Sequence, residues 1–222
     1  MSAPLHARHN GQSTTVPHAA AAEVERHVRH LCRTAGDLPF HGWHHVSFVR
    51  DKGAQFAAAN GADVSVVTTA ALVHDLNYLV ARNSAAAAGR ELRMRILADA
   101  GVTPTVARWI DDVVDEAEMA TRHRDISVEA QALSDADTLF KALPITPVLL
   151  AHRYLAENGV SLRQLATKIV GEQRHVHDAG FYFYNPEAAA AYSHWATANL
   201  ELWQCVVEAL DDPSVTELVA AI

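Results

Sequence analysis

The chain has 222 residues, 50% of them hydrophobic and 20% charged, with a formal net charge of −8 at pH 7. This composition is that of a globular protein, and its acidic balance argues against nucleic-acid binding. There is no apolar run long enough for a membrane span, and the polar first sixteen residues lack the apolar centre of a signal peptide, so we expect a cytoplasmic protein.

Almost every segment after Pro17 carries the apolar spacing and boundary residues of helices. Asp63 and Ser127 are expected N-caps, and Thr103 followed by Pro104 is a further helix start. Alternating strand patterns are scarce, so the chain is predicted to be all-α. Helices are expected at about 18–34, 41–60, 64–75, 83–100, 104–118, 127–143, 145–157, 161–175 and 186–210, with a short last one from about 214.

The length suits one domain. We expect a disordered tail over residues 1–16 and a single helical bundle of roughly nine to ten helices over 17–222. Fold class alone does not indicate function, because helical bundles serve many functions. The function must therefore be argued from individual residues.

The dipeptide His-Asp occurs twice, and its surroundings distinguish the two copies. His74-Asp75 closes an apolar segment that begins at Val66, whereas His177-Asp178 follows a polar helix end. An imidazole and a carboxylate at the end of a buried helix must be paired or bound to a metal, because an unpaired buried charge is very costly. We therefore expect a functional site at His74 and Asp75 and none at His177.

Two other segments carry residues of the same chemistry. In Phe40-His41-Gly42-Trp43-His44-His45, the residues His41 and His45 are four apart and share a helix face, whereas His44 points elsewhere. Asp135 and Asp137 lie inside a helix with apolar residues on both sides of it, and buried aspartates need partners. Periodicity does not choose between these two carboxylates.

The order His45, His74-Asp75 and Asp137, each on its own helix, resembles the HD-domain superfamily of metal-dependent phosphohydrolases. The phrases are His45-Val-Ser-Phe-Val49, Ala70-Ala71-Leu72-Val73-His74-Asp75 and Asp135-Ala136-Asp137-Thr138-Leu139. The resemblance covers about residues 38–142, the expected metal-site core, and leaves the C-terminal helices of 145–222 without a motif. In that family the second acid of the last phrase is usually the ligand, which favours Asp137.

The resemblance implies one divalent ion held by His45, His74, Asp75 and Asp137, with Asp75 also orienting the attacking water. Mixed nitrogen and oxygen ligands favour manganese, iron or cobalt, and magnesium is also compatible. The chain departs from the family at Thr138, where an arginine is usual. It also lacks the histidine that many members place before the last aspartate, and the nearest is His123. The second departure argues against a second metal ion.

Five further residues are candidates for the reaction. The phrase at 40–45 is similar to one in cyclic-nucleotide phosphodiesterases, which implies that His41 protonates the leaving group; the alternative is a helix-start histidine that donates to backbone. Glu116 borders an apolar helix face and is a candidate acid or base, or a solvated surface residue. Lys52, Arg82 and Lys141 lie near the ligand segments and are candidate phosphate contacts, or ordinary surface charges.

The expected function is thus hydrolysis of a phosphate ester or anhydride in a nucleotide or similar small metabolite. Two alternatives are a di-iron oxygenase of related fold, which needs more histidines than this chain supplies, and a non-catalytic module that binds a nucleotide. The expected partner is a small phosphorylated substrate, with no nucleic acid and no membrane. A monomer and a homodimer are both compatible with the sequence.

Overall fold

Helices make up the regular structure of the computed structural model, which describes residues 15–34, 38–119, 122 and 125–221. Ten of the helices in this part have eight residues or more, and it contains no strand. The all-α prediction is confirmed. The helices are α1 (His18–Thr34), α2 (Trp43–Asn60), α3 (Val64–Val73), α4 (Asn77–Val80), η1 (Ala86–Gly89), α5 (Arg90–Asp99), α6 (Pro104–Glu116), α7 (Val128–Ala142), α8 (Thr146–Leu149), α9 (Ala151–Asn158), α10 (Leu162–Asp178), α11 (Pro186–Ala209) and α12 (Pro213–Ala220).

Capping residues fix where several of these helices begin. The Asp63 carboxylate accepts hydrogen bonds from the backbone N–H groups of Ser65 and Val66 at 2.9 and 3.2 Å. The Ser127 hydroxyl accepts one from Ala130 N at 3.3 Å. Both contacts satisfy N–H groups that have no partner within the helix. The starts of α3 and α7 are therefore determined by local sequence, as predicted.

The chain differs from the prediction between residues 74 and 90. One helix was expected from residue 83, but Asn83 lies in the left-handed region with φ +56°, which stops a right-handed helix from starting there. Asn77 instead donates to the Ser84 carbonyl at 2.6 Å and closes an irregular loop. The short helix η1 takes the place of the expected first two turns, α5 begins only at Arg90, and α4 lies before the expected start.

The described part of the chain begins at Thr15. Residues 1–14 of the predicted disordered tail lie outside the described residues. Val16, however, is buried, and its backbone N–H donates to the Ser65 hydroxyl at 3.0 Å. Val16 thus packs into the core just before the predicted start of the bundle at residue 17.

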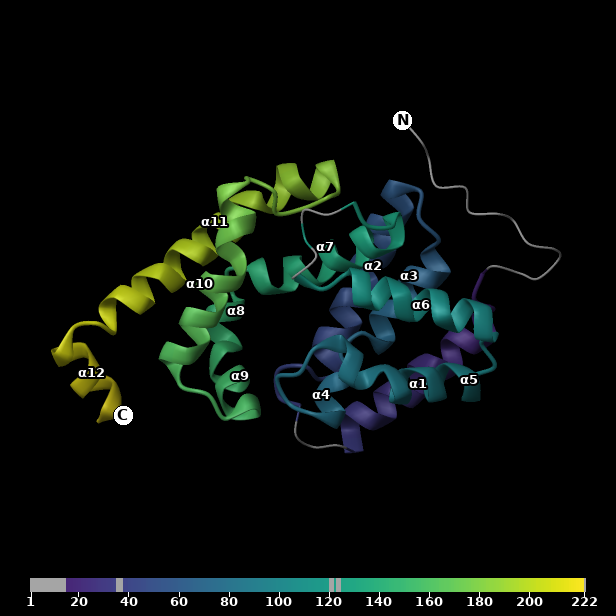
Figure 1. The fold of residues 1–222 in the computed structure, drawn as a ribbon, viewed down its shortest axis with the longest axis horizontal. Helices are drawn as coiled ribbons and strands as arrows, with labels where there is room; N and C mark the ends of the chain where they lie inside the picture. Colours follow the sequence, from purple (N-terminus) through teal and green to yellow (C-terminus); the bar gives the residue numbers. More distant parts are fainter. Residues whose placement is uncertain (1–14, 35–37, 120–121, 123–124, 222) are drawn as a thin grey trace.

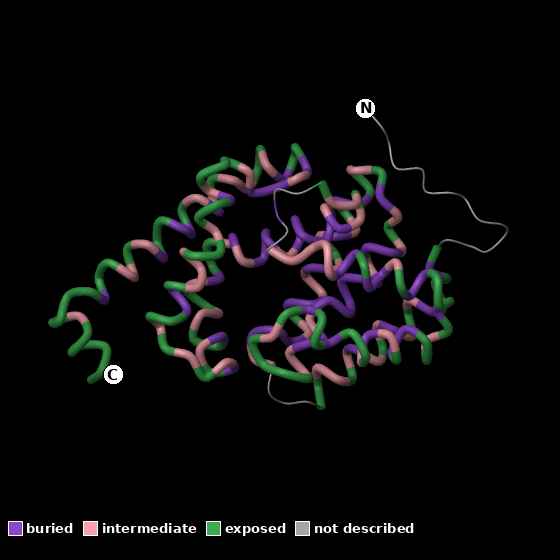
Figure 2. The backbone as a smooth tube through the Cα atoms, in the orientation of Figure 1, coloured by how far each residue is buried: buried purple, intermediate pink, exposed green. Residues whose placement is uncertain are grey.

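The hydrophobic core lies around α3, which is apolar on nearly all sides. Val66, Val67, Ala70 and Val73 have no exposed surface, and α2 packs along both α3 and α7. Figure 2 shows this centre as a nearly continuous buried region. Burial of apolar surface is the main stabilising contribution to folding, and here it holds rigid the helices that carry the candidate ligands.

The C-terminal helices form a second group on the far side of α7 from α1 and α5 (Figure 1). Within this group α10 packs along α11, and α11 also contacts α7. The last helix, α12, has no buried residue and lies at the far end of the molecule. None of the helices in the described residues is long and apolar enough to cross a membrane.

A buried ion pair joins α5 to α6. Arg93 has no exposed surface, and its Nε donates to the Asp111 carboxylate at 2.8 Å. We expect Asp111→Ala to lower the free energy of unfolding by about 3 kcal/mol, because the buried guanidinium loses its nearer carboxylate and keeps Asp115, at 3.4 Å, as the remaining one. Chemical denaturation measures this change. Asp112→Ala, at the exposed neighbouring position, is the matched control, and equal losses in both variants would contradict the prediction.

Candidate metal centre and its cavity

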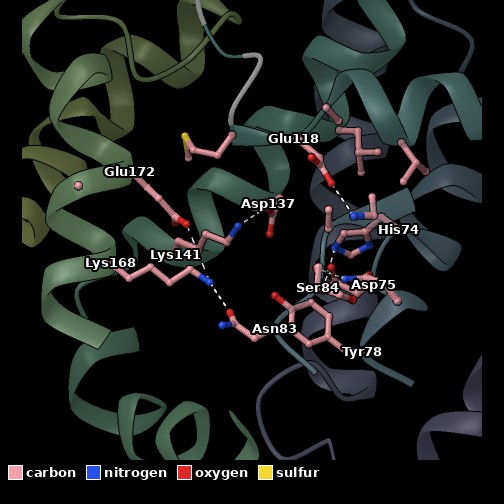
Figure 3. Close-up of a pocket in the computed structure, with 18 of the residues that line it drawn as sticks. His74, Asp75, Tyr78, Asn83, Ser84, Glu118, Asp137, Lys141, Lys168 and Glu172 are labelled. Atoms are coloured by element: carbon pink, nitrogen blue, oxygen red, sulfur yellow. Dashed lines mark hydrogen bonds and ion pairs between the residues drawn. The ribbon is translucent and has the colours of Figure 1, made fainter. Parts of the chain in front are cut away.

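A cavity of about 460 Å³ lies between the two groups of helices. Figure 3 shows His74, Asp75 and Tyr78 on one side, Lys168 and Glu172 of α10 on the other, and side chains of α7 between them. The segment between α3 and η1 and the end of α6 complete the wall. Residues distant in sequence thus meet around one polar space.

Two histidines and one aspartate converge at the inner end of this cavity. His45 Nε2 lies 2.8 Å from Asp75 Oδ2 and 3.1 Å from His74 Nε2, and His74 Nε2 lies 3.1 Å from Asp75 Oδ2. His45 comes from α2, while His74 and Asp75 occupy the turn that follows α3. Both imidazoles are buried. We call these three residues the metal group.

The protonation of the metal group is constrained by its geometry. His74 Nδ1–H donates to the Ala71 carbonyl at 2.8 Å, which leaves Nε2 as the acceptor of the neutral ring. Two Nε2 atoms 3.1 Å apart cannot both carry protons. Burial lowers the pKa of His45, whereas Asp75 overcomes burial and raises the pKa of His74. Although burial opposes ionisation of Asp75, the two imidazoles hold its pKa well below the usual range.

The donor set fits a divalent cation. Asp75 Oδ2 is buried and, among the described residues, makes no properly aligned hydrogen bond despite the two nearby nitrogens. The metal group is the set of His and carboxylate donors in this part of the chain that could hold an ion. Neutral imidazole and carboxylate are common ligands of transition metals. A positive charge between these three atoms would satisfy all of them at once.

Asp137, the fourth predicted ligand, lies beside the metal group. Its Oδ1 is 3.6 Å from His45 Nε2, and its Oδ2 accepts from Lys141 Nζ at 2.6 Å. Burial raises the pKa of Asp137, but Lys141 and the two histidines outweigh it and lower the pKa overall. The carboxylate is thus ionised and lines the cavity, with one oxygen bound by lysine and the other directed at the metal group.

Asp135 has a different environment on the same helix. It is fully buried, its carboxylate accepts from Arg122 at 2.9 Å, and it also accepts the backbone N–H groups of Tyr184 and Asn185 at 2.9 and 2.7 Å. Burial raises its pKa to about 6, while Arg122 acts in the opposite direction. Asp135 therefore anchors the loop between α10 and α11, and only Asp137 lines the cavity.

His41 is held by a residue from the C-terminal helices. Its Nδ1–H donates to the buried carboxylate of Glu157 on α9, which also accepts the backbone N–H groups of Phe40 and His41 at 2.7 and 3.1 Å. Burial opposes ionisation of Glu157, yet the contact with His41 keeps its pKa lowered. The His41 ring also stacks on Tyr78, with centroids 3.5 Å apart. These contacts fix both the position and the tautomer of His41. Its Nε2 is therefore the ring atom left to exchange a proton with a ligand.

Gly42 allows this segment to turn beside His41. A Cβ atom at this position would lie 2.5 Å from the Leu38 carbonyl oxygen, which is closer than any real contact. Only glycine therefore fits between His41 and the start of α2. His44, by contrast, is exposed, in agreement with its predicted direction away from the other two histidines.

Glu116 lies outside the wall of the cavity. Its carboxylate accepts from the Ser127 backbone N–H and hydroxyl at 2.9 and 2.6 Å, and it is not part of the cavity wall. This contact joins the end of α6 to the start of α7, which is a structural role. The geometry therefore offers no support for Glu116 as a catalytic acid or base, and the acid of that segment that lines the cavity is Glu118.

The three candidate phosphate contacts differ in their position relative to the cavity. Lys141 lines the cavity, whereas Lys52 and Arg82 do not. Lys52 donates to Gln55 on its own helix at 3.1 Å, and Arg82 donates to the Glu157 carbonyl at 2.6 Å. Of the three, only Lys141 is placed to meet an anionic ligand in this cavity.

Lys168 is a cavity residue that the sequence did not indicate. Its ammonium donates to Asn83 Oδ1 at 2.6 Å and to the Tyr154 hydroxyl at 3.0 Å. The contact with Asn83 joins α10 to the loop after α4 (Figure 3). It lies on a helix without a recognisable motif, and its partners are 14 and 85 residues away. His177 contacts Tyr182 at 2.6 Å and does not line this cavity. His123 lies outside the described residues.

Comparisons with known proteins show a related fold. A scan against models of protein families finds no match, and a search of curated proteins finds none either. Among solved structures, the chain is similar to a structural-genomics protein from Lactobacillus plantarum, with a TM-score of 0.67 and 19% identity. The similarity covers 89% of this chain and 100% of the other. At this identity the likeness concerns the fold alone.

Proposed function

We propose that this protein is a metal-dependent phosphohydrolase of the HD-domain type, which cleaves a phosphate ester or anhydride in a small metabolite such as a nucleotide. The observation that carries the proposal is the buried metal group, His45, His74 and Asp75, at the inner end of a polar cavity. The order of these residues and of Asp137 along the chain resembles that family, and Asp137 Oδ1 lies 3.6 Å from His45 Nε2.

The metal group would hold the ion, and Asp137, beside it, would be the fourth ligand. The mixed donor set favours manganese, iron or cobalt over calcium. A divalent ion supplies Lewis acidity: it lowers the pKa of a bound water and offsets charge that develops on phosphorus. Asp75, whose carboxylate stays ionised, is the residue best suited to accept a hydrogen bond from the attacking water.

Lysines supply the positive charge that an acidic protein needs for an anionic substrate. Lys141 lies beside Asp137, and Lys168 lies across the cavity from the metal group. Their ammonium groups can donate to phosphate oxygens as point charges. An ammonium group has three N–H donors. Lys141 donates to Asp137, and Lys168 donates to Asn83 and Tyr154, so each can add a phosphate oxygen to these hydrogen bonds.

His41 would donate the proton that the leaving oxygen requires. We expect His41→Gln to lower kcat about 100-fold or more on phenyl phosphate, in line with the usual contribution of general acids. The loss should be much smaller on p-nitrophenyl phosphate, whose leaving group departs without a proton. Steady-state kinetics with added Mn²⁺ measures both. His44→Gln is the matched control at an exposed site, and an equal loss on the two substrates would remove His41 from this role.

A screen with manganese- or cobalt-loaded protein against nucleotides and aryl phosphates tests the proposed function directly. Hydrolysis that requires His45 and Asp137 supports it. Two irons per chain would favour the oxygenase alternative. Metal uptake without hydrolysis of any phosphate would leave a non-catalytic binding module.

A further inference from the structure

A second, smaller cavity adjoins the first beside His41. Its volume is about 100 Å³. We call it the annex. Its wall is mainly apolar and includes Phe40, Ala151, Leu165, Ile169 and Trp203. The annex and the larger cavity have a common border formed by Tyr78, Met119, Lys141, Lys168 and Glu172.

The two groups with proposed chemical roles face different cavities. His74, Asp75 and Asp137 line the larger one, whereas His41 lines the annex. Tyr78, which stacks on His41, belongs to both. A phosphate ester with its phosphoryl group at the metal group and its leaving oxygen near His41 must therefore cross this border. The part of the substrate beyond the leaving oxygen then enters the annex.

The lining of the annex selects what can enter. Two of its polar side chains already bind the protein: the Thr146 hydroxyl donates to the Phe140 carbonyl at 2.7 Å, and the Asn199 amide donates to the Lys141 carbonyl at 3.1 Å. Apart from His41, the wall contains the charged residues Lys141, Lys168 and Glu172. All three lie at the border with the larger cavity. Beyond that border, apolar surface dominates, and it favours an apolar group that leaves water.

The size of the annex limits that group. An apolar protein cavity of about 150 Å³ accepts benzene, and the annex is of the same order and open toward the larger cavity. We propose that the annex binds the leaving group, so that the preferred substrates are phosphate monoesters of a compact aromatic or apolar alcohol. This inference rests on the proposed function, because the metal group fixes the position of the phosphoryl end.

Binding of two phosphonates tests the annex without requiring catalysis. Calorimetry on the Mn²⁺-loaded protein compares phenylphosphonate, which carries the ring, with methylphosphonate, which does not. We expect phenylphosphonate to bind at least about tenfold more tightly to the unmodified chain. Ile169→Trp and Ala151→Phe fill the annex from α10 and α9 and should each abolish that preference. Thr167→Trp adds the same side chain at an exposed site of α10 and should retain it.

Hydrolysis of phenyl phosphate and pyrophosphate by the same proteins separates the two proposals. A preference for phenylphosphonate without hydrolysis of either substrate would support the annex and contradict the phosphohydrolase. Equal affinity for the two phosphonates, or no binding of either, would overturn the annex proposal even if hydrolysis occurs. Equal loss of the preference in Thr167→Trp would overturn it as well. Thermal melting shows whether Ile169→Trp and Ala151→Phe fold. If one of them does not fold, the other still tests the annex.

Discussion

His45→Ala is expected to weaken Mn²⁺ binding by more than about 100-fold and to abolish phosphate hydrolysis. The imidazole is fully buried, and its Nε2 lies within 3.1 Å of both other members of the metal group. Loss even of an outer partner of a metal ligand costs about 10–100-fold in affinity, so loss of a ligand should cost more. Elemental analysis of the purified protein and calorimetric titration with Mn²⁺ measure the change.

The matched control is His44→Ala, which removes the adjacent, exposed imidazole from the same helix. It should leave metal content and activity within about twofold of the unmodified chain. Asp137→Ala should also lose metal, since its Oδ1 is the remaining oxygen near His45. Retention of one metal per chain in His45→Ala would show that the site lies elsewhere, and no uptake by the unmodified chain would refute the phosphohydrolase proposal.

Asp135→Ala is expected to lower the free energy of unfolding by about 3–5 kcal/mol, which is the usual cost of leaving a buried charge without its partner. The lost carboxylate contacts Arg122 and two backbone N–H groups, all away from water. Near neutral pH the carboxylate is ionised, because burial raises its pKa only to about 6. The melting temperature should fall by about 10 °C, and the protein that remains folded should keep its metal.

Asp137→Ala, two positions along the same helix, provides the contrast. Its carboxylate is 22% exposed and pairs with the partly exposed Lys141, so its removal should cost less than about 1 kcal/mol. The two variants thus separate stability from metal binding. The double variant Arg122→Met/Asp135→Leu should recover only part of the stability, because it removes the unpaired charge but leaves the backbone N–H groups of Tyr184 and Asn185 without their acceptor. If Asp135→Ala lost metal while Asp137→Ala kept it, the roles of the two aspartates would be reversed.

Local signals explain what the sequence predicted well. Asp63 and Ser127 begin their helices because the caps act on residues two or three positions away. The buried segment that ends in His74 and Asp75 is visible as an apolar run, and its end is where the structure has the metal group. Such features depend on neighbours along the chain, so periodicity and capping rules reveal them.

Contacts between distant segments explain what the sequence did not reveal. The choice between Asp135 and Asp137 depends on Arg122 and on the loop after α10, neither of which is apparent from the periodicity of α7. Glu157 contacts His41 across 116 residues, in a region without a motif. An acid beside an apolar helix face can equally well bind the start of the next helix, and Glu116 accepts hydrogen bonds from Ser127 there.

The contact between His41 and Glu157 separates two events in the synthesis of this protein. Every proposed metal ligand has been translated once Asp137 is added, whereas Glu157 follows 20 residues later. Synthesis of the proposed metal ligands is therefore complete before the carboxylate that orients His41 is added. The contact between His41 and Glu157 closes a loop of 116 residues. Closing this loop costs entropy, which packing of the C-terminal helices offsets. A chain that ended before α9 would contain every proposed metal ligand but would lack the carboxylate that orients His41.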